Sequence, residues 1–133
     1  MALIVPNNGE GDALQYYVNK AAPENLILRL FTNNITPAET DVAATYTEAA
    51  GFGYAAITLT GASWGAPSEG APSSIAYAQQ TFTFTGALGN VYGYYETRAT
   101  SGRIALAERF TDGPYNIVNN GDQIKITPTI TAD

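Results

Sequence analysis

The sequence predicts an all-β protein: an antiparallel β-sandwich of about eight strands, jelly-roll-like, with one short N-terminal helix. Three observations support this prediction. From Gln79 to Ile130, short segments alternate apolar and polar residues with a period of two, which is typical of half-buried strands. The segments ALGN, TSG, TDGP and NNGD separate them, and their glycine and asparagine residues favour tight hairpin turns. The 133 residues, 45% of them hydrophobic, suffice for a single domain, residues 1–133, with a buried core.

The first residues allow two interpretations. Leu3, Ile4 and Val5 are apolar, but they show no alternation that would assign one face to a core. The segment Ala2–Pro6 is therefore either a first edge strand or part of an N-terminal arm, residues 1–11, that docks onto a neighbouring protein.

A helical pattern follows from Asp12 to Ala21. Its apolar residues recur at a 3-4-3 spacing, which predicts a short helix laid over one end of the sandwich, with a strand as the alternative. These residues are Leu14, Tyr17, Val18 and Ala21. Asp12 and Gln15 resemble a capping box at the start of the helix, and Pro23 is expected to end it.

Two strands are expected before the long loop of the chain. Asn25–Phe31 alternates cleanly, with leucines on one face and Arg29 on the other, and Gly53–Thr60 directs Ile57 and Leu59 inward. The polar segment between them, residues 33–50, is expected to be a connection with a short strand at Ala44–Thr47.

The loop from Gly61 to Ser73 contains two prolines, three glycines and the single tryptophan, Trp64. Loops of this length in compact domains are usually functional or ordered by a partner. After the loop, Ser74–Gln80 is expected to begin a strand that continues through Phe82 and Phe84.

The hairpin from Val91 to Phe110 permits a prediction of register. If Thr100 and Ser101 form a two-residue turn, Tyr95 faces Leu106 and Gly93 faces Glu108. The large aliphatic residues then share one face, with Glu108 among them, and Tyr92 and Tyr94 lie on the other. This register places Glu96 and Glu108 on opposite faces, which argues against a pair of catalytic carboxylates. A slip of one residue would merge the two faces.

Composition argues against several classes of function. The net charge is −6 and the six Lys and Arg residues are scattered, which disfavours binding to nucleic acid. No apolar run approaches about 18 residues, so we expect no membrane span, and the N-terminus lacks the pattern of a signal peptide. There is no histidine or cysteine, and no phosphate-binding glycine motif. We therefore expect no enzyme activity, no cofactor and no metal site.

The surface composition instead favours an interface. Charged residues make up 14% of the chain, which contains nine tyrosines, and charge depletion with aromatic enrichment is typical of interface cores. Tyr92 and Tyr94 are candidates for protein contact, although plain surface or packing against a second sheet, and a sugar-stacking platform, are alternatives for them. The full set of candidate contact residues is Leu3, Ile4, Val5, Trp64, Tyr92 and Tyr94.

Four segments together resemble a family of small proteins encoded by tailed bacteriophages. They are APENLILRLFTNNITPAETD (22–41), GYAAITLTGASW (53–64), AYAQQTFTFTGALGNVYGYYET (76–97) and ALAERFTDGPYNIVNNGDQIKITPTI (105–130). The likeness covers most of the chain, but its motifs spell strands and turns and contain no reactive signature. One departure is Ala105–Ala107, where the family has a bulkier aromatic residue before Ala-Glu-Arg-Phe.

This resemblance implies a virion structural protein, specifically a capsid decoration (cement) protein. Its implied partners are the major capsid protein and further copies of itself, as a dimer or trimer. Its implied location is the capsid exterior, after synthesis in the cytoplasm of the host bacterium. Two alternatives stay open: a tail, baseplate or head-fibre subunit, and a carbohydrate-binding module.

Overall fold

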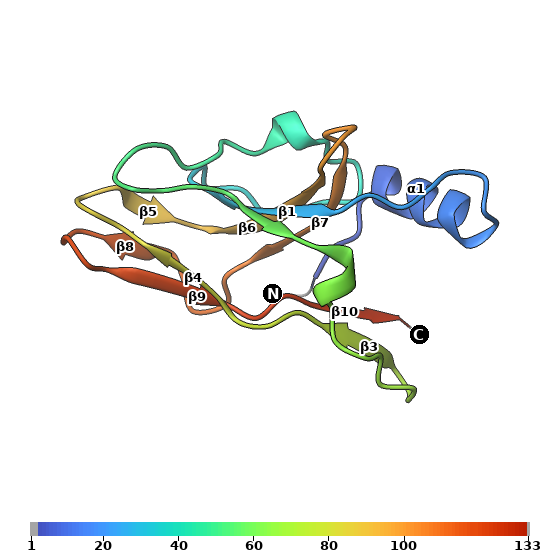
Figure 1. The fold of residues 1–133 in the computed structure, drawn as a ribbon. Coiled ribbons are helices and arrows are strands. Elements are labelled where there is room, and N and C mark those ends of the chain that lie inside the picture. The colour runs from blue at the N-terminus through green and yellow to red at the C-terminus, as the bar shows by residue number, and fades with distance from the viewer. Residues whose placement is uncertain (1–2, 133) are drawn as a thin grey trace.

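A computed structural model describes residues 3–132 and shows a mostly β protein with one short α-helix (Figure 1). Within these residues, ten short strands form four separate antiparallel sheets. The elements are α1 (Asn7–Tyr17), β1 (Leu26–Phe31), η1 (Ala43–Thr45), β2 (Ile57–Leu59), η2 (Gly61–Ser63), β3 (Ser73–Ala76), β4 (Gln80–Thr83), β5 (Gly89–Val91), β6 (Gly93–Arg98), β7 (Ile104–Arg109), β8 (Tyr115–Ile117), β9 (Gln123–Ile126) and β10 (Thr129–Ala132). The predicted all-β class and the N-terminal helix are therefore confirmed.

The largest sheet has four strands in the order β2-β1-β6-β7. Its second strand, β1, is the strand expected at Asn25–Phe31, and it pairs with β6 over its whole length. Leu28 and Leu30 are buried on one face of β1, while Arg29 lies on the other face and binds Glu48. The alternation in the sequence thus assigned this strand and its leucine face correctly, but the face of Arg29, which was expected to point outward, is covered by a second buried cluster that includes Phe31.

The remaining three sheets are two-stranded. Together with the β6–β7 pair of the large sheet, they are nested about one turn. The pairs β6–β7, β5–β8, β4–β9 and β3–β10 follow one another outward from the turn at residues 99–102. Residues 73–98 therefore run antiparallel to residues 104–132 as one interrupted ribbon. Of these four pairs, one joins strands that are consecutive in the chain, so the hairpin turns expected at ALGN, TDGP and NNGD connect strands that do not pair with each other.

The ribbon is interrupted where the backbone cannot continue its ladder. Pro128 lies between β9 and β10 and has no N–H to donate, although its carbonyl still accepts a hydrogen bond from the Tyr77 N–H at 2.8 Å. The strand expected from Ser74 through Phe84 is consequently split into β3 and β4, which pair with different partners. The hydrogen bonding thus defines four small, separate sheets.

Two other expected elements differ in extent. The strand expected at Ala44–Thr47 is instead the short 3-10 helix η1, although Glu48 just after it forms an isolated bridge with Phe31. The strand expected at Gly53–Thr60 is reduced to Ile57–Leu59. Residues 51–53 precede it with positive φ angles, a conformation that extended strands do not contain.

The β6–β7 hairpin has the predicted register only near its turn. Thr97 pairs with Ile104 as expected, but the next pair is Glu96 with Leu106. Ala105 is therefore an extra residue, a β-bulge, and every later pair is shifted by one. The shift places Glu108 opposite Tyr94, not Gly93. It also places Glu96 and Glu108 on the same face, which corrects the predicted separation.

The four-stranded sheet is covered on both faces. One face and the outer ladders of the ribbon share the main core cluster: Leu28, Leu30, Ala49, Leu59, Phe82, Phe84, Val91, Tyr94, Leu106, Ile117, Ile124 and Ile126. The other face packs against the connection that contains η1. This second cluster consists of Phe31, Tyr46, Tyr95, Ile104 and Ala107. The central strands β1 and β6 therefore lie between two apolar layers.

Helix α1 begins and ends at residues other than those predicted. Its N-cap is Pro6, and the helix starts at Asn7, five residues before the expected Asp12. It ends in a Schellman motif, because Asn19 adopts a left-handed conformation and the Lys20 N–H donates to the Gln15 carbonyl at 2.8 Å. Pro23 does not end the helix.

Candidate protein interface

The outward face of α1 carries an apolar stripe that no other part of the described structure covers. Leu14 and Tyr17 on α1 and Val18, its C-cap residue, stand at helical spacing and are 68%, 91% and 68% exposed. The sequence predicted these residues as the buried face. Helices on a protein surface normally turn their apolar stripe toward the core, and contiguous exposed apolar residues mark interaction sites. The stripe, defined as these three residues, is the strongest interface candidate in the described residues.

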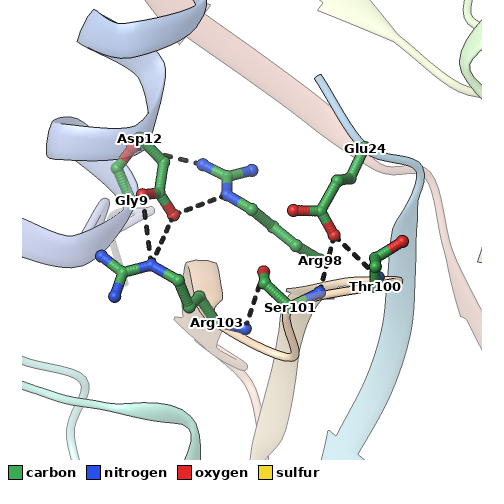
Figure 2. A network of polar contacts seen from close by, with 7 residues as sticks. All are labelled: Gly9, Asp12, Glu24, Arg98, Thr100, Ser101 and Arg103. Carbon is green, nitrogen blue, oxygen red and sulfur yellow. Dashed lines mark hydrogen bonds and ion pairs between the residues drawn. The ribbon is translucent and has the colours of Figure 1, made fainter. Parts of the chain in front are cut away.

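The opposite face of α1 is attached to the β6–β7 hairpin by charge. Asp12 is 6% exposed and accepts hydrogen bonds from Arg98 Nε at 2.8 Å and from Arg103 Nε at 3.0 Å. Figure 2 shows both guanidinium groups approaching this one carboxylate. The Arg98 guanidinium also lies 4.9 Å from the centre of the Tyr16 ring. Burial raises the pKa of Asp12, but the hydrogen bonds from Arg103 and Arg98 outweigh it, so the pKa lies below its ordinary value.

Close backbone packing reinforces this attachment. The bulged residue Ala105 turns its carbonyl toward Gly9, and a Cβ at Gly9 would lie 2.2 Å from that oxygen. Two glycines among eleven residues give α1 a poor intrinsic helix propensity. The helix therefore depends on its contacts with the hairpin, and those contacts fix which way its stripe faces.

Gly9→Ala is expected to lower the free energy of unfolding by about 1–3 kcal/mol, because the new methyl group must displace α1 or the Ala105 carbonyl. The matched control is Gly11→Ala on the same helix, where a Cβ meets nothing within 4 Å. The control is expected to gain about 0.5–1 kcal/mol from helix propensity alone. Urea denaturation of both variants measures the difference, and equal stabilities would show that the close approach at Gly9 is unimportant.

Glu24 holds the tip of the same hairpin. Its Oε1 accepts hydrogen bonds from the backbone N–H groups of Thr100 and Ser101 at 2.7 and 2.8 Å, as Figure 2 also shows. The hydrogen bond from the Ser101 N–H is the main reason that the pKa of Glu24 lies below its ordinary value. The segment that follows α1 and the hairpin turn are thus held together.

Two apolar hollows lie beside α1. One, of about 310 Å³, is lined by Tyr16, Leu26, Trp64 and Ile130 among other residues. The second, of about 320 Å³, shares Tyr16, Leu26 and Ile130 with it and extends along β10. The apolar surface on this side of the molecule is therefore not limited to the stripe.

The predicted contact residues at the N-terminus take an edge position. The Ile4 N–H donates to the Ala107 carbonyl and the Ala107 N–H donates to the Ile4 carbonyl, both at 2.9 Å. Leu3 and Val5 pack against the main core cluster. Residues 3–5 thus lie along β7 as an edge strand would, which is one of the two alternatives that the sequence left open.

The predicted aromatic contacts do not form one surface. Tyr94 is a core residue, 6% exposed, and its hydroxyl donates to Glu108 Oε2 at 3.1 Å. Tyr92 is half-buried against the second cluster, with the Arg109 guanidinium 5.1 Å from its ring centre. The prediction that Tyr92 and Tyr94 share one face was wrong, because the strand is interrupted at Tyr92, between β5 and β6, and Tyr94 pairs with Leu30 of β1 on the side of the main core. Trp64 is half-buried and packs edge-on against Tyr77 at 5.3 Å.

A polar hollow of about 310 Å³ lies between the β6–β7 hairpin and the segment that contains β8 and β9. Glu108, Phe110, Tyr115 and Lys125 contribute to its lining. The Phe110 and Tyr115 rings are 4.5 Å apart, and the Tyr115 hydroxyl donates to Asp112. Aromatic faces beside a carboxylate and an ammonium group are a combination that can hold a small polar ligand.

Residues 3–132 contain no cluster of three or more acidic side chains placed to hold a metal ion. No helix in this part of the chain is long and apolar enough to cross a membrane. Comparisons with protein-family models, with curated proteins and with solved structures find no match to this chain.

Proposed function

We propose that this protein is a bacteriophage virion structural protein: a capsid decoration protein that binds the major capsid protein and further copies of itself and stabilises the shell. It acts by binding and not as an enzyme, at the exterior of the capsid. The observation that carries the proposal is the exposed stripe on α1, because a helix anchored by a buried ion cluster presents three apolar side chains to a partner. The resemblance of the sequence to small phage proteins indicates that the partner is the major capsid protein.

The charge distribution supports this proposal. Arg98 and Arg103 are bound to Asp12, and Arg29 is bound to Glu48, so half of the six cationic residues are used inside the chain. The rest of the surface is left strongly acidic. An acidic surface is repelled by packaged DNA and is therefore suited to the outside of a particle.

We also propose that the four-stranded sheet and the outer ladders of the ribbon are the two layers of a β-sandwich of the jelly-roll type. The nesting of four ladders about one turn supports this, since a jelly roll is an antiparallel ribbon folded over on itself. Residues of β1 and of the β4–β9 ladder belong to one core cluster, as the two sheets of a sandwich do. A rigid two-layer body of this kind suits a protein that clamps its neighbours.

Replacing the stripe by serine (Leu14→Ser, Tyr17→Ser and Val18→Ser together) is expected to weaken binding to capsids about tenfold or more. This corresponds to about 1.4 kcal/mol, within the range for apolar residues at the centre of an interface. The free energy of unfolding is expected to change little, because all three side chains are exposed. Co-sedimentation with capsids that lack the protein measures the affinity.

The matched control replaces exposed apolar residues elsewhere: Val42→Ser, Phe52→Ser and Val118→Ser. This variant is expected to bind like the unmodified protein. If the stripe variant binds capsids as tightly as the unmodified protein does, α1 is not part of the interface. Capsids that withstand heating equally well with and without the protein would contradict the decoration function itself, and particles that lack tails in its absence would favour the tail alternative.

The polar hollow gives the carbohydrate-binding alternative its one specific support. Phe110 and Tyr115 offer aromatic faces there, beside the polar groups of Glu108 and Lys125. Binding of the isolated protein to a glycan array, with no binding to capsids, would favour this second function over the first.

A further inference from the structure

Glu96 is a carboxyl group in the centre of the main core. It lies on β6, the third strand of the four-stranded sheet, and is 1% exposed. Its cross-strand neighbours are Leu28 on β1 and Leu106 on β7, both fully inside the main core cluster. Its Oε2 is the one buried side-chain oxygen or nitrogen in residues 3–132 without a hydrogen-bond partner. An unpaired carboxylate in such surroundings is strongly destabilising, whereas a neutral carboxylic acid is much less so.

The cations near Glu96 are engaged elsewhere. Arg98, two residues along the same strand, donates to Asp12 of α1 and to the Gly9 carbonyl. On β1, Arg29 lies on the opposite face of the sheet and binds Glu48. Neither guanidinium is therefore available to compensate a negative charge at Glu96.

The other titratable groups around Glu96 do not compensate a charge either. On β7, Glu108 lies on the same face as Glu96 and accepts the hydrogen bond of Tyr94, the neighbour of Glu96 on β6. From α1, Tyr16 lies against Arg98. The ladders across the core contribute apolar side chains to the same cluster: Phe82, Ile124 and Ile126.

We propose that Glu96 is a proton-dependent latch: its neutral carboxylic acid is accommodated between β1 and β7, and its ionisation loosens the packing of the four-stranded sheet on the ribbon. Burial raises the pKa of Glu96 from its ordinary value of 4.5 to about 8. The folded protein thus holds the proton more tightly than the unfolded chain does. The stabilisation is complete below pH 4.5, declines as the pH rises above that value, and is lost once the pH passes about 8. The latch is independent of the proposed function.

The composition of the chain makes this effect measurable. With no histidine and no cysteine, the side chains that ordinarily titrate between pH 6 and pH 9 are missing. The terminal amino group titrates in the same range, but it is common to the unmodified protein and its variants. A difference in pH dependence between the protein and Glu96→Gln therefore reports on Glu96.

The test is urea denaturation of the unmodified protein and of Glu96→Gln between pH 5 and pH 7. The unfolding constant of the unmodified protein is expected to rise about tenfold per pH unit relative to that of Glu96→Gln, because one proton is released on unfolding. Glu69→Gln, which removes an exposed carboxylate, serves as the matched control and is expected to keep the pH dependence of the unmodified protein. Parallel curves for the protein and Glu96→Gln would overturn the proposal.

A second measurement covers the case in which Glu96→Gln does not fold. Carbon-13 NMR of the glutamate carboxyl groups follows their ionisation in the unmodified, folded protein. One carboxyl resonance is expected to titrate well above the normal range for glutamate, in keeping with the pKa of about 8 for Glu96. If every glutamate carboxyl is already ionised at pH 6, the latch does not exist.

Discussion

Replacing Asp12 with alanine is expected to lower the free energy of unfolding by about 3 kcal/mol. The reason is the position of Arg98, whose side chain is 7% exposed and which has Asp12 as its partner in an ion pair. Without that carboxylate, the guanidinium is left buried with the Gly9 carbonyl and the Tyr16 ring as its remaining contacts. The removal of one partner from a buried ion pair costs more than the pair itself contributes, because an uncompensated charge is left behind.

The contribution of Asp12 to the free energy of unfolding is expected to decrease at acidic pH. Its folded-state pKa lies below the ordinary value of 3.8, through the hydrogen bonds from Arg103 and Arg98 that outweigh burial. The stabilisation is therefore complete above pH 3.8 and is lost as the pH falls through the folded-state pKa. The stability difference between the protein and Asp12→Ala is expected to shrink below that point.

A double-mutant cycle separates the ion pair from other effects of the substitution. Arg98→Met removes the charge and keeps an apolar stem, so the double variant Asp12→Ala with Arg98→Met leaves no buried charge between them. It is expected to be more stable than the sum of the two single variants implies. Urea denaturation of the four proteins gives the coupling energy. Additive losses would mean that the two side chains do not act as a pair.

Asp12 also illustrates what the sequence could not reveal about the site. Its partners Arg98 and Arg103 lie 86 and 91 positions away, and no local pattern links them. The spacing of Leu14, Tyr17 and Val18 correctly indicated a helix in this part of the chain. Spacing tells which residues share a face, but not which face is buried. Here the distant hairpin binds the polar face, so the predicted core face is the exposed one.

The β-structure was more predictable than the interface, and its errors have physical causes. Alternation at Asn25–Phe31 identified β1 and its leucine face, but not that the face of Arg29 is covered too, because the segment that covers it lies outside the strand. The register of the β6–β7 hairpin was correct next to the turn and wrong beyond Ala105, because a bulge leaves no mark in a period of two. The same bulge brings Glu108 opposite Tyr94 and places Leu106 on the core face that Tyr94 shares.

Phe31→Ala is expected to lower the free energy of unfolding by about 3–5 kcal/mol, the usual range for loss of a fully buried aromatic ring. Phe31 ends β1 and is 0% exposed. Its ring centre lies 5.0 Å from that of Tyr46 and 6.4 Å from that of Tyr95. On its other side the ring occupies the space left by Gly93, where a Cβ would come within 2.6 Å of it. Because it is enclosed by these groups, the cavity left by alanine cannot close easily.

The loss of stability in Phe31→Ala is expected to be largest locally, in the connection between β1 and β2. Phe31 and Tyr95 are on the sheet, whereas Tyr46 belongs to the connection and stacks on Tyr95 at 4.8 Å. Without the Phe31 ring, that segment keeps few apolar contacts with the sheet, so its local opening becomes easier. Hydrogen exchange is expected to speed up at the amides of Thr32 and Ala49, whose hydrogen bonds join the segment to β1.

The matched control is Phe52→Ala, which removes the same ring from a residue that is 48% exposed. Its loss is expected to stay near 0.5 kcal/mol, as for surface substitutions in general. A loss at Phe31 no larger than this would mean that the second aromatic cluster does not hold the connection on the sheet. A large loss with unchanged exchange at Thr32 and Ala49 would mean that the cluster stabilises the whole fold and not this segment in particular. Only a large loss of stability together with faster exchange supports the conclusion that the second cluster holds the connection on the face of the sheet that carries Phe31 and Tyr95.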